Sequence, residues 1–189
     1  MNKTVLLILF LITNTLFAQK NCEYSTNITD SIGTYKVTKE FMMYEKKFAG
    51  NSSYIFYSLA LTDGTPTLNM QLIRKSKDFM KANCFDKDSK LTLQLNNGKI
   101  VTLLHIKQEN CGSLIRDTEG YDNRVLVGVF MFVEGSIKDL KSSPVNLMRI
   151  KYLTDTEDYV ISKEFKSELN DKIYQPETYF MDNLKCIEK

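Results

Sequence analysis

Apolar and polar positions alternate on both sides of Asp63 and Gly64, which predicts a β-hairpin with a two-residue turn at this dipeptide. A turn of this length fixes which residues lie opposite one another in the two strands. The resulting register brings apolar residues face to face in three pairs, namely Ile55 with Leu72, Tyr57 with Met70, and Leu59 with Leu68. Cross-strand apolar pairs stabilise a sheet, so the pattern supports this register.

A second hairpin is predicted for residues 91–104 (LTLQLNNGKIVTLL), because Asn97 and Gly98 form a strong two-residue turn signal. Gly98 is expected to need a positive φ, which a residue with a Cβ tolerates poorly. The register of a two-residue turn gives three pairs across the strands, namely Leu95 with Ile100, Leu93 with Thr102, and Leu91 with Leu104.

Further strands are predicted on both sides of these hairpins. One strand is predicted at residues 34–45, before the first hairpin. Residues 125–133 (VLVGVFMFV) are apolar on both faces, which is typical of a strand in the centre of a sheet. Residues 145–153 and 158–162 are expected to pair with each other around the turn at 154–157.

Helices are predicted to be few and to lie late in the chain. Ser136 and Asp139 have the spacing of a capping box, and Pro144 ends that helix. A short helix is predicted at residues 163–171, and Pro176 is predicted to open the last helix because proline is favoured at the first helical position. The apolar stripe of this last helix consists of Phe180, Leu184 and Ile187.

These elements together predict an α+β fold. Most of it is antiparallel β-sheet built from hairpins, with a few short helices that include a C-terminal helix.

Residues 1–18 have the layout of a secretory signal peptide. Lys3 supplies the positive charge, and residues 5–12 (VLLILFLI) form an apolar run that is too short to span a membrane. Cleavage is expected after Ala18. Cys22 then lies beyond the new N-terminus, so we do not expect it to carry a lipid. Residues 19–189 are then a single exported domain with no membrane span, located in the periplasm or secreted.

Four cysteines remain in the exported domain, and an even number in an exported chain predicts disulfides with three possible connectivities. The strands of the second hairpin carry Cys84 and Cys111 to the same end, so this hairpin favours a bond between them. By elimination, Cys22 then pairs with Cys186 and ties the start of the exported domain to its last helix.

The charge balance gives little indication of a charged partner. The chain has 25 Lys and Arg residues against 23 Asp and Glu residues, and no long block of like charge. Such a chain has no electrostatic drive toward nucleic acid. Its 10 Tyr and 11 Phe residues, with no Trp, predict a core rich in aromatic side chains. The partner is therefore expected to be an unknown protein or a component of the cell envelope.

Few residues are candidates for chemistry. His105 is the only histidine and is interpreted as an ordinary strand residue, because no nucleophile motif accompanies it. Residues 86–89 (DKDS) resemble the start of a calcium loop but lack the glycine and glutamate that such a loop needs later. Residues 154–158 (TDTED) contain three carboxylates in a turn, where acidic side chains usually point into water. We therefore predict no catalytic residue, no metal site and no cofactor.

One region is dense in aromatic residues, whose faces could bind sugars or peptides but are expected to belong to the core. These residues are Phe41, Tyr44, Phe48, Tyr54, Phe56 and Tyr57.

The C-terminal half, residues 85–187, resembles small exported proteins of unknown function from Gram-negative bacteria of the flavobacterial kind. Four segments carry this resemblance: LTLQLNNGKIVTLL at 91–104, SSPVNLMRIKY at 142–152, DYVI at 158–161 and LKCI at 184–187. The resemblance implies no activity and assigns no residue a role.

Two functions follow as hypotheses. The first is a non-enzymatic exported domain that binds a partner or contributes to the envelope, because export and disulfides accompany no catalytic motif. The alternative is a secreted hydrolase whose carboxylates are dispersed along the sequence.

Overall fold

The computed structural model describes residues 21–106 and 108–188. The signal peptide predicted for residues 1–18 lies outside the described residues. Within them, no helix is long and apolar enough to cross a membrane.

Most of the described chain is antiparallel β-sheet, and only two short α-helices accompany it, one of them at the C-terminus. The fold is therefore largely β, and the predicted α+β class fits it only loosely. The strands are β1 (Tyr24–Thr29), β2 (Thr34–Thr38), β3 (Phe41–Phe48), β4 (Asn51–Thr62), β5 (Thr65–Ser76), β6 (Lys90–Leu95), β7 (Ile100–His105), β8 (Ser113–Arg116), β9 (Asp122–Phe132), β10 (Val145–Lys151), β11 (Thr156–Val160), β12 (Phe165–Lys166) and β13 (Ile173–Tyr174). The helices are α2 (Ser136–Ser142) and α3 (Tyr179–Asn183), with 3-10 turns η2 (Pro176–Thr178) and η3 (Leu184–Ile187).

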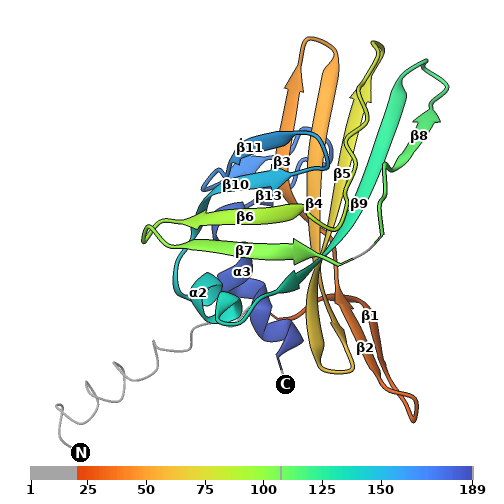
Figure 1. Cartoon of the computed structure of the whole chain (residues 1–189). Coiled ribbons are helices and arrows are strands. Elements are labelled where there is room, and N and C mark those ends of the chain that lie inside the picture. The colour runs from red at the N-terminus through yellow and green to blue at the C-terminus, as the bar shows by residue number, and fades with distance from the viewer. Residues whose placement is uncertain (1–20, 107, 189) are drawn as a thin grey trace, which may run out of the picture.

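Eleven strands form one sheet that bends sharply between β9 and β7. The strand order is β1-β2-β4-β5-β9-β7-β6-β10-β11, with β3 also paired to β4 and β8 to β9. The shorter strands β6, β7, β10 and β11 run across the long strands β3, β4, β5 and β9, as in an orthogonal sheet packing (Figure 1). We call the face of β4, β5 and β9 that meets them the inner face, and the opposite one the outer face.

The hydrophobic core lies between these two parts of the sheet. The hydroxyl of Tyr57 on β4 donates to Sδ of Met148 on β10 at 2.6 Å. The ring of Phe85 stacks on that of Tyr152, with centroids 5.4 Å apart. The C-terminal helix closes the core with Phe180, whose ring lies 6.0 Å from that of Tyr57. The predicted stripe of the last helix is correct, since Phe180, Leu184 and Ile187 are all buried.

The hairpin of β4 and β5 has the register that the sequence predicted. Tyr57 lies opposite Met70, and the two flanking apolar pairs are as expected. Asp63 and Gly64 both have positive φ, 49° and 80°. Two successive positive φ values are the signature of the primed turns that match strand twist.

The hairpin of β6 and β7 differs from its predicted register by one residue. Leu93 lies opposite Val101 instead of Thr102. The cause is the turn, which has three residues rather than two, because the N–H of Leu95 donates to the carbonyl of Lys99 at 2.9 Å. Gly98 has the expected positive φ, 83°. The shift reverses the faces of β7, so Ile100 is exposed to solvent.

Four further predictions are corrected. Residues 163–171 contain no helix, because β12 pairs with β13 there. The strand expected at 34–45 is two strands, β2 and β3, which both pair with β4. Ser136 caps no helix, since the N-cap of α2 is Gly135. Strand β9 lies inside the sheet but is not buried on both faces, because Val127 is 42% exposed.

Two disulfides join the ends of distant segments. Cys22 is bonded to Cys186, with Cα atoms 5.5 Å apart, and Cys84 to Cys111, with Cα atoms 4.0 Å apart. The second bond is the one that the hairpin favoured, and the first is the one inferred by elimination. The hydroxyl of Tyr24 also donates to the carbonyl of Cys186 at 2.8 Å, so β1 and the last turn of the chain are held together.

Candidate functional site

The only histidine is part of the core. His105 is 5% exposed, and its ring lies 5.2 Å from that of Phe85 and 5.5 Å from that of Phe130. Its Nδ1 is 2.9 Å from the backbone carbonyl oxygen of Asp86. A ring enclosed in this way lies away from any substrate in solvent, and its contacts are those of a packed strand residue.

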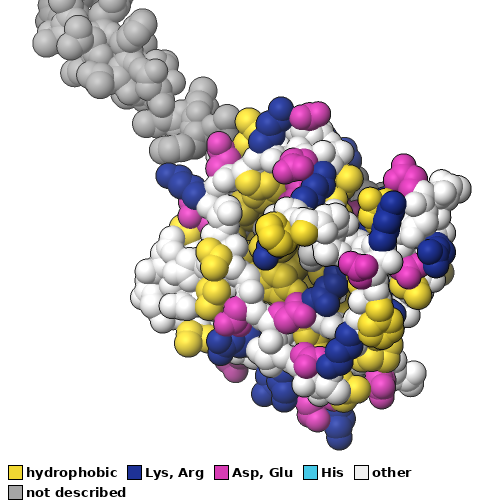
Figure 2. All heavy atoms as spheres, turned by 90° about the horizontal axis from the view of Figure 1, so that it is seen from above, with side chains coloured by type: hydrophobic (Ala, Val, Ile, Leu, Met, Phe, Trp, Pro, Cys, Tyr) yellow, Lys and Arg dark blue, Asp and Glu magenta, His cyan; other side chains and the backbone are white. Residues whose placement is uncertain are grey.

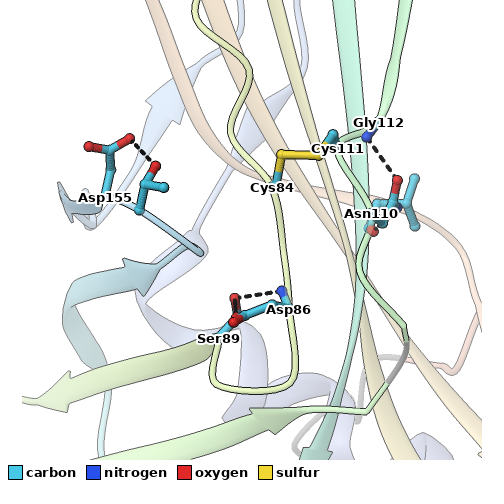
Figure 3. The surroundings of a disulfide bond; sticks show 9 residues. Cys84, Asp86, Ser89, Asn110, Cys111, Gly112 and Asp155 are labelled. Atoms are coloured by element: carbon cyan, nitrogen blue, oxygen red, sulfur yellow. Dashed lines mark hydrogen bonds between the residues drawn. A yellow bond between two sulfur atoms is a disulfide. The ribbon is translucent and has the colours of Figure 1, made fainter.

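The loop that resembles a calcium site closes on itself. Oδ1 of Asp86 accepts hydrogen bonds from Oγ of Ser89 at 2.7 Å and from the backbone N–H of Asp88 at 3.1 Å. The backbone N–H of Asp86 in turn donates to Oγ of Ser89 at 3.0 Å (Figure 3). The hydrogen bond from Ser89 is the main reason why the pKa of Asp86 lies below its ordinary value. No three His, Cys, Asp or Glu side chains within the described ranges are grouped so that they could hold a metal ion.

The three carboxylates of residues 154–158 are bound to three different cations. Asp155 accepts from Nζ of Lys81 at 2.7 Å. Asp158 accepts two hydrogen bonds from Arg149, each at 2.7 Å. The third, Glu157, pairs with Arg74. This arrangement does not provide the two facing carboxylates that glycoside hydrolysis requires.

Glu157 is the centre of a polar network at the inner face of β5. Its Oε2 accepts from Arg74 and from the hydroxyl of Tyr159, and its Oε1 accepts from Nδ2 of Asn83 at 3.2 Å. The hydroxyl of Tyr152 lies 3.3 Å from that of Tyr159. The side chains of Arg74 and Glu157 are 23% and 33% exposed, so the ion pair is largely shielded from water.

The network holds its carboxylate in the charged form. Burial raises the pKa of Glu157, but the hydrogen bonds from Arg74 and Tyr159 lower it by a larger amount. The net pKa therefore lies below its ordinary value. Burial and the neighbouring Tyr152 raise the pKa of Tyr159, which stays a donor. A charged carboxylate whose oxygens are already bonded has a structural role and is poorly suited to proton transfer.

The loop between β5 and β6 covers this network. It supplies Asn83, and the carbonyl of Met80 accepts from Arg124 at 3.5 Å. The disulfide from Cys84 to Cys111 fixes the end of the loop beside β9 (Figure 3). Gly112 follows this bond with φ 70°, and a Cβ on it would lie 2.2 Å from the carbonyl oxygen of Val125. A glycine is thus needed where these two segments of the backbone approach this closely.

A cavity lies at the ends of the long strands, beside the turn between β3 and β4. It has a volume of about 490 Å³ and is bordered by Phe48, Tyr54, Lys75 and Tyr121 among others. A second cavity of about 300 Å³ shares Phe48 and Lys75 and extends to Met80. Seen from above, hydrophobic side chains lie in the middle of this end of the molecule, surrounded by both acidic and basic ones (Figure 2).

Two large aromatic side chains at this end are exposed. Phe48, the last residue of β3, is 74% exposed, and Phe79, next to Met80, is 93% exposed. Lys75 is bound within the chain, because its Nζ lies 2.8 Å from Asp117 and 4.5 Å from the ring centre of Tyr121. We call Phe48, Tyr54, Lys75, Phe79 and Tyr121 the tip surface.

The aromatic region that the sequence singled out is divided between core and surface. Tyr54 and Tyr57 are buried, as the core interpretation expected, but Phe48 is not. No local sequence pattern indicates the network around Glu157, because Arg74 and Glu157 are distant in the chain and meet only through the bend in the sheet.

The chain was compared with known protein families, with curated proteins and with solved structures, and none of the three comparisons gave a match. The resemblance noted for residues 85–187 therefore stays a prediction.

Proposed function

We propose that the chain is an exported, non-enzymatic binding domain and that its tip surface holds a protein of the cell envelope. The observation that carries this proposal is the exposure of Phe48, which borders two neighbouring cavities, and of Phe79, which precedes the lining residue Met80 in the chain. Exposed aromatic side chains at a hollow are typical anchors of protein interfaces, since their burial by a partner contributes most of the binding energy.

The charges around the two phenylalanines support a protein partner. Basic and acidic side chains alternate there, as in the pairs of Lys75 with Asp117 and Lys47 with Glu168. A rim of mixed charge around an apolar centre is the usual composition of a protein interface. It offers no continuous positive field for nucleic acid.

The compartment is part of the proposal. Disulfides persist in oxidising environments, and both pairs of cysteines in this chain are bonded. Together with the leader predicted for residues 1–18, they support the periplasm or the exterior of the cell. The alternative hypothesis, a hydrolase, has no support from the three carboxylates of residues 154–158, because each is bound to its own cation.

Photo-crosslinking in an envelope extract tests the proposal. A crosslinker is introduced into the purified mature chain at Asn51, the first residue of β4, beside the tip surface. This chain should capture a discrete protein. The double variant Phe48→Ser/Phe79→Ser should lose at least about 90% of that product, because two interface anchors are removed. The control Ile100→Ser/Val160→Ser removes two side chains of similar exposure, 68% and 72%, from other surfaces and should retain the product.

All variants should show the same circular dichroism, since the substituted side chains are exposed. Equal capture by the double variant and by the wild type would contradict a binding role for the tip surface.

A further inference from the structure

The outer face of the long strands carries a groove that is separate from the tip surface. Its volume is about 320 Å³, and none of its lining residues borders either tip cavity. Its exposed walls include Tyr35, which is 44% exposed, and Val127, which is 42% exposed.

Strand register explains which side chains meet in this groove. Two rows cross β4, β5 and β9: Phe56 lies opposite Gln71, which lies opposite Val127, and Ser58, Asn69 and Val129 form the next row in the same way. Side chains alternate between faces, so these rows lie on the opposite side from the core residues Tyr57 and Met70. The groove thus has an apolar wall at each side and two amides between them.

The two amides have little or no bonding within the protein. The side chain of Gln71 makes no hydrogen bond with any other described residue, and Nδ2 of Asn69 reaches only Oγ of Ser58, at 3.5 Å. Each amide offers both donors and an acceptor. Both are fixed on neighbouring pleats of the same strand, roughly 7 Å apart along β5. They are therefore arranged to bond groups of a ligand.

The described lining of the groove is nearly free of charge. Among the described residues, Glu40 is the only charged one that borders it. A charged ligand would lose its hydration here without gaining an ion pair, which disfavours it. A ligand that fits must be neutral, must have an apolar face for the rings of Tyr35 and Phe56, and must carry several donors and acceptors for Asn69 and Gln71.

We propose that this groove binds a neutral carbohydrate. A sugar ring has a face of C–H groups that packs on an aromatic ring, and an edge of hydroxyls that bond to amide side chains. These are the two kinds of contact that the groove provides side by side. The site needs no part of the tip surface, so it does not depend on the function proposed above.

Calorimetric titration of the purified mature chain with neutral hexasaccharides tests the inference. The probes are hexamers of β-1,4-linked glucose, of β-1,4-linked N-acetylglucosamine and of α-1,4-linked glucose. At least one should bind. Gln71→Ala should weaken that binding about fivefold, as expected for one neutral hydrogen bond. Its matched control, Gln94→Ala on the exposed side of β6, should bind as the wild type does.

A second pair of variants tests the aromatic contact. Tyr35→Ala should weaken binding about tenfold, because it removes a ring on which the sugar packs. Phe79→Ala, which removes an exposed ring from the tip surface, should not change it. If none of the three hexasaccharides binds at millimolar concentration, or if Tyr35→Ala and Gln71→Ala bind as well as the controls, the inference is wrong. It is also wrong if light scattering shows dimers of the wild type that Tyr35→Ala abolishes, because the groove would then be an interface between copies.

Discussion

Two polar side chains of strand β5, Arg74 on the inner face and Gln71 on the outer face, are used in opposite ways. On the inner face, Arg74 is joined to Glu157, and Asn83 and Tyr159 complete the network. On the outer face, Gln71 has no partner among the described residues, although it is on the same strand. Polar groups that are bonded within the chain hold the two parts of the sheet together. Polar groups that are left without partners on a fixed surface are available to a ligand.

The difference follows from what covers each face. The bend in the sheet places β11 over the inner face, and the loop between β5 and β6 adds Asn83. A charge that is shielded there must be paired, because an unpaired one would cost several kcal/mol. The outer face keeps its contact with water, so an amide without a partner costs little.

The largest loss of stability is expected when the disulfide from Cys84 to Cys111 is removed, because this bond fixes the loop between β5 and β6. The variant Cys84→Ala/Cys111→Ala should be less stable by about 3 kcal/mol, because the bond closes a loop with a sequence separation of 27 residues. Denaturation in urea measures this loss. Hydrogen exchange of the backbone should become faster in β5 next to Arg74 and at Asn83. Unchanged stability would mean that the loop is held by its other contacts.

Breaking the ion pair of the network is expected to have the next largest effect. Arg74→Ala should cost about 2 kcal/mol, since it leaves the carboxylate of Glu157 shielded and short of a donor. The matched control is Arg149→Ala, which removes an equally well-formed pair with Asp158 whose side chains are 55% and 43% exposed. The control should cost less than about 1 kcal/mol, because solvent screens it. Equal losses of stability in the two variants would refute the structural role of the network.

The pH dependence of stability tests whether the charged carboxylate of Glu157 stabilises the fold. The pKa of Glu157 is lower in the folded chain than its ordinary value of 4.5, so its charge stabilises the fold above pH 4.5 and ceases to do so as the pH falls through the folded pKa. Between pH 7 and pH 3, the wild type should therefore lose more stability than Glu157→Gln does. Urea denaturation at both pH values gives this difference, and parallel losses in the two proteins would show that Glu157 has an ordinary pKa.

The smallest effect is expected on the outer face. Gln71→Ala should change stability by less than about 0.5 kcal/mol, since its amide makes no hydrogen bond with any other residue in the described ranges. Gln94→Ala, on the exposed side of β6, should behave in the same way. Thermal unfolding of the two variants makes the comparison. A clear destabilisation by Gln71→Ala alone would show that its amide contributes to the fold.

Local signals in the sequence predicted some parts of the fold well. The turn at Asp63 and Gly64 fixed the register of β4 and β5, because two residues with positive φ allow only one tight connection. The turn at Gly98 contains one residue more, and nothing local separates a two-residue from a three-residue turn there. The bond from Cys84 to Cys111 was still expected, since the cysteines flank the hairpin in either register.

Elements that depend on distant contacts could not be read from the sequence. The apolar spacing in residues 163–171 suggested a helix, but the positive φ of Asp171 turns the chain and lets β12 pair with β13. The polar network was missed for a similar reason. Arg74 and Glu157 come together only because the sheet bends and places β11 across β5, and no local pattern contains that information.

Side-chain amide NMR of the mature chain tests most directly whether the two faces of β5 differ in this way. The NH₂ group of Asn83 should exchange slowly with solvent, because it is bonded to Glu157 under the loop. The NH₂ group of Gln71 should exchange fast, and it should shift when the hexasaccharide that binds in calorimetry is added, while that of Asn83 stays unchanged. Slow exchange at Gln71 in the free protein, or a shift at Asn83 without one at Gln71, would contradict the account.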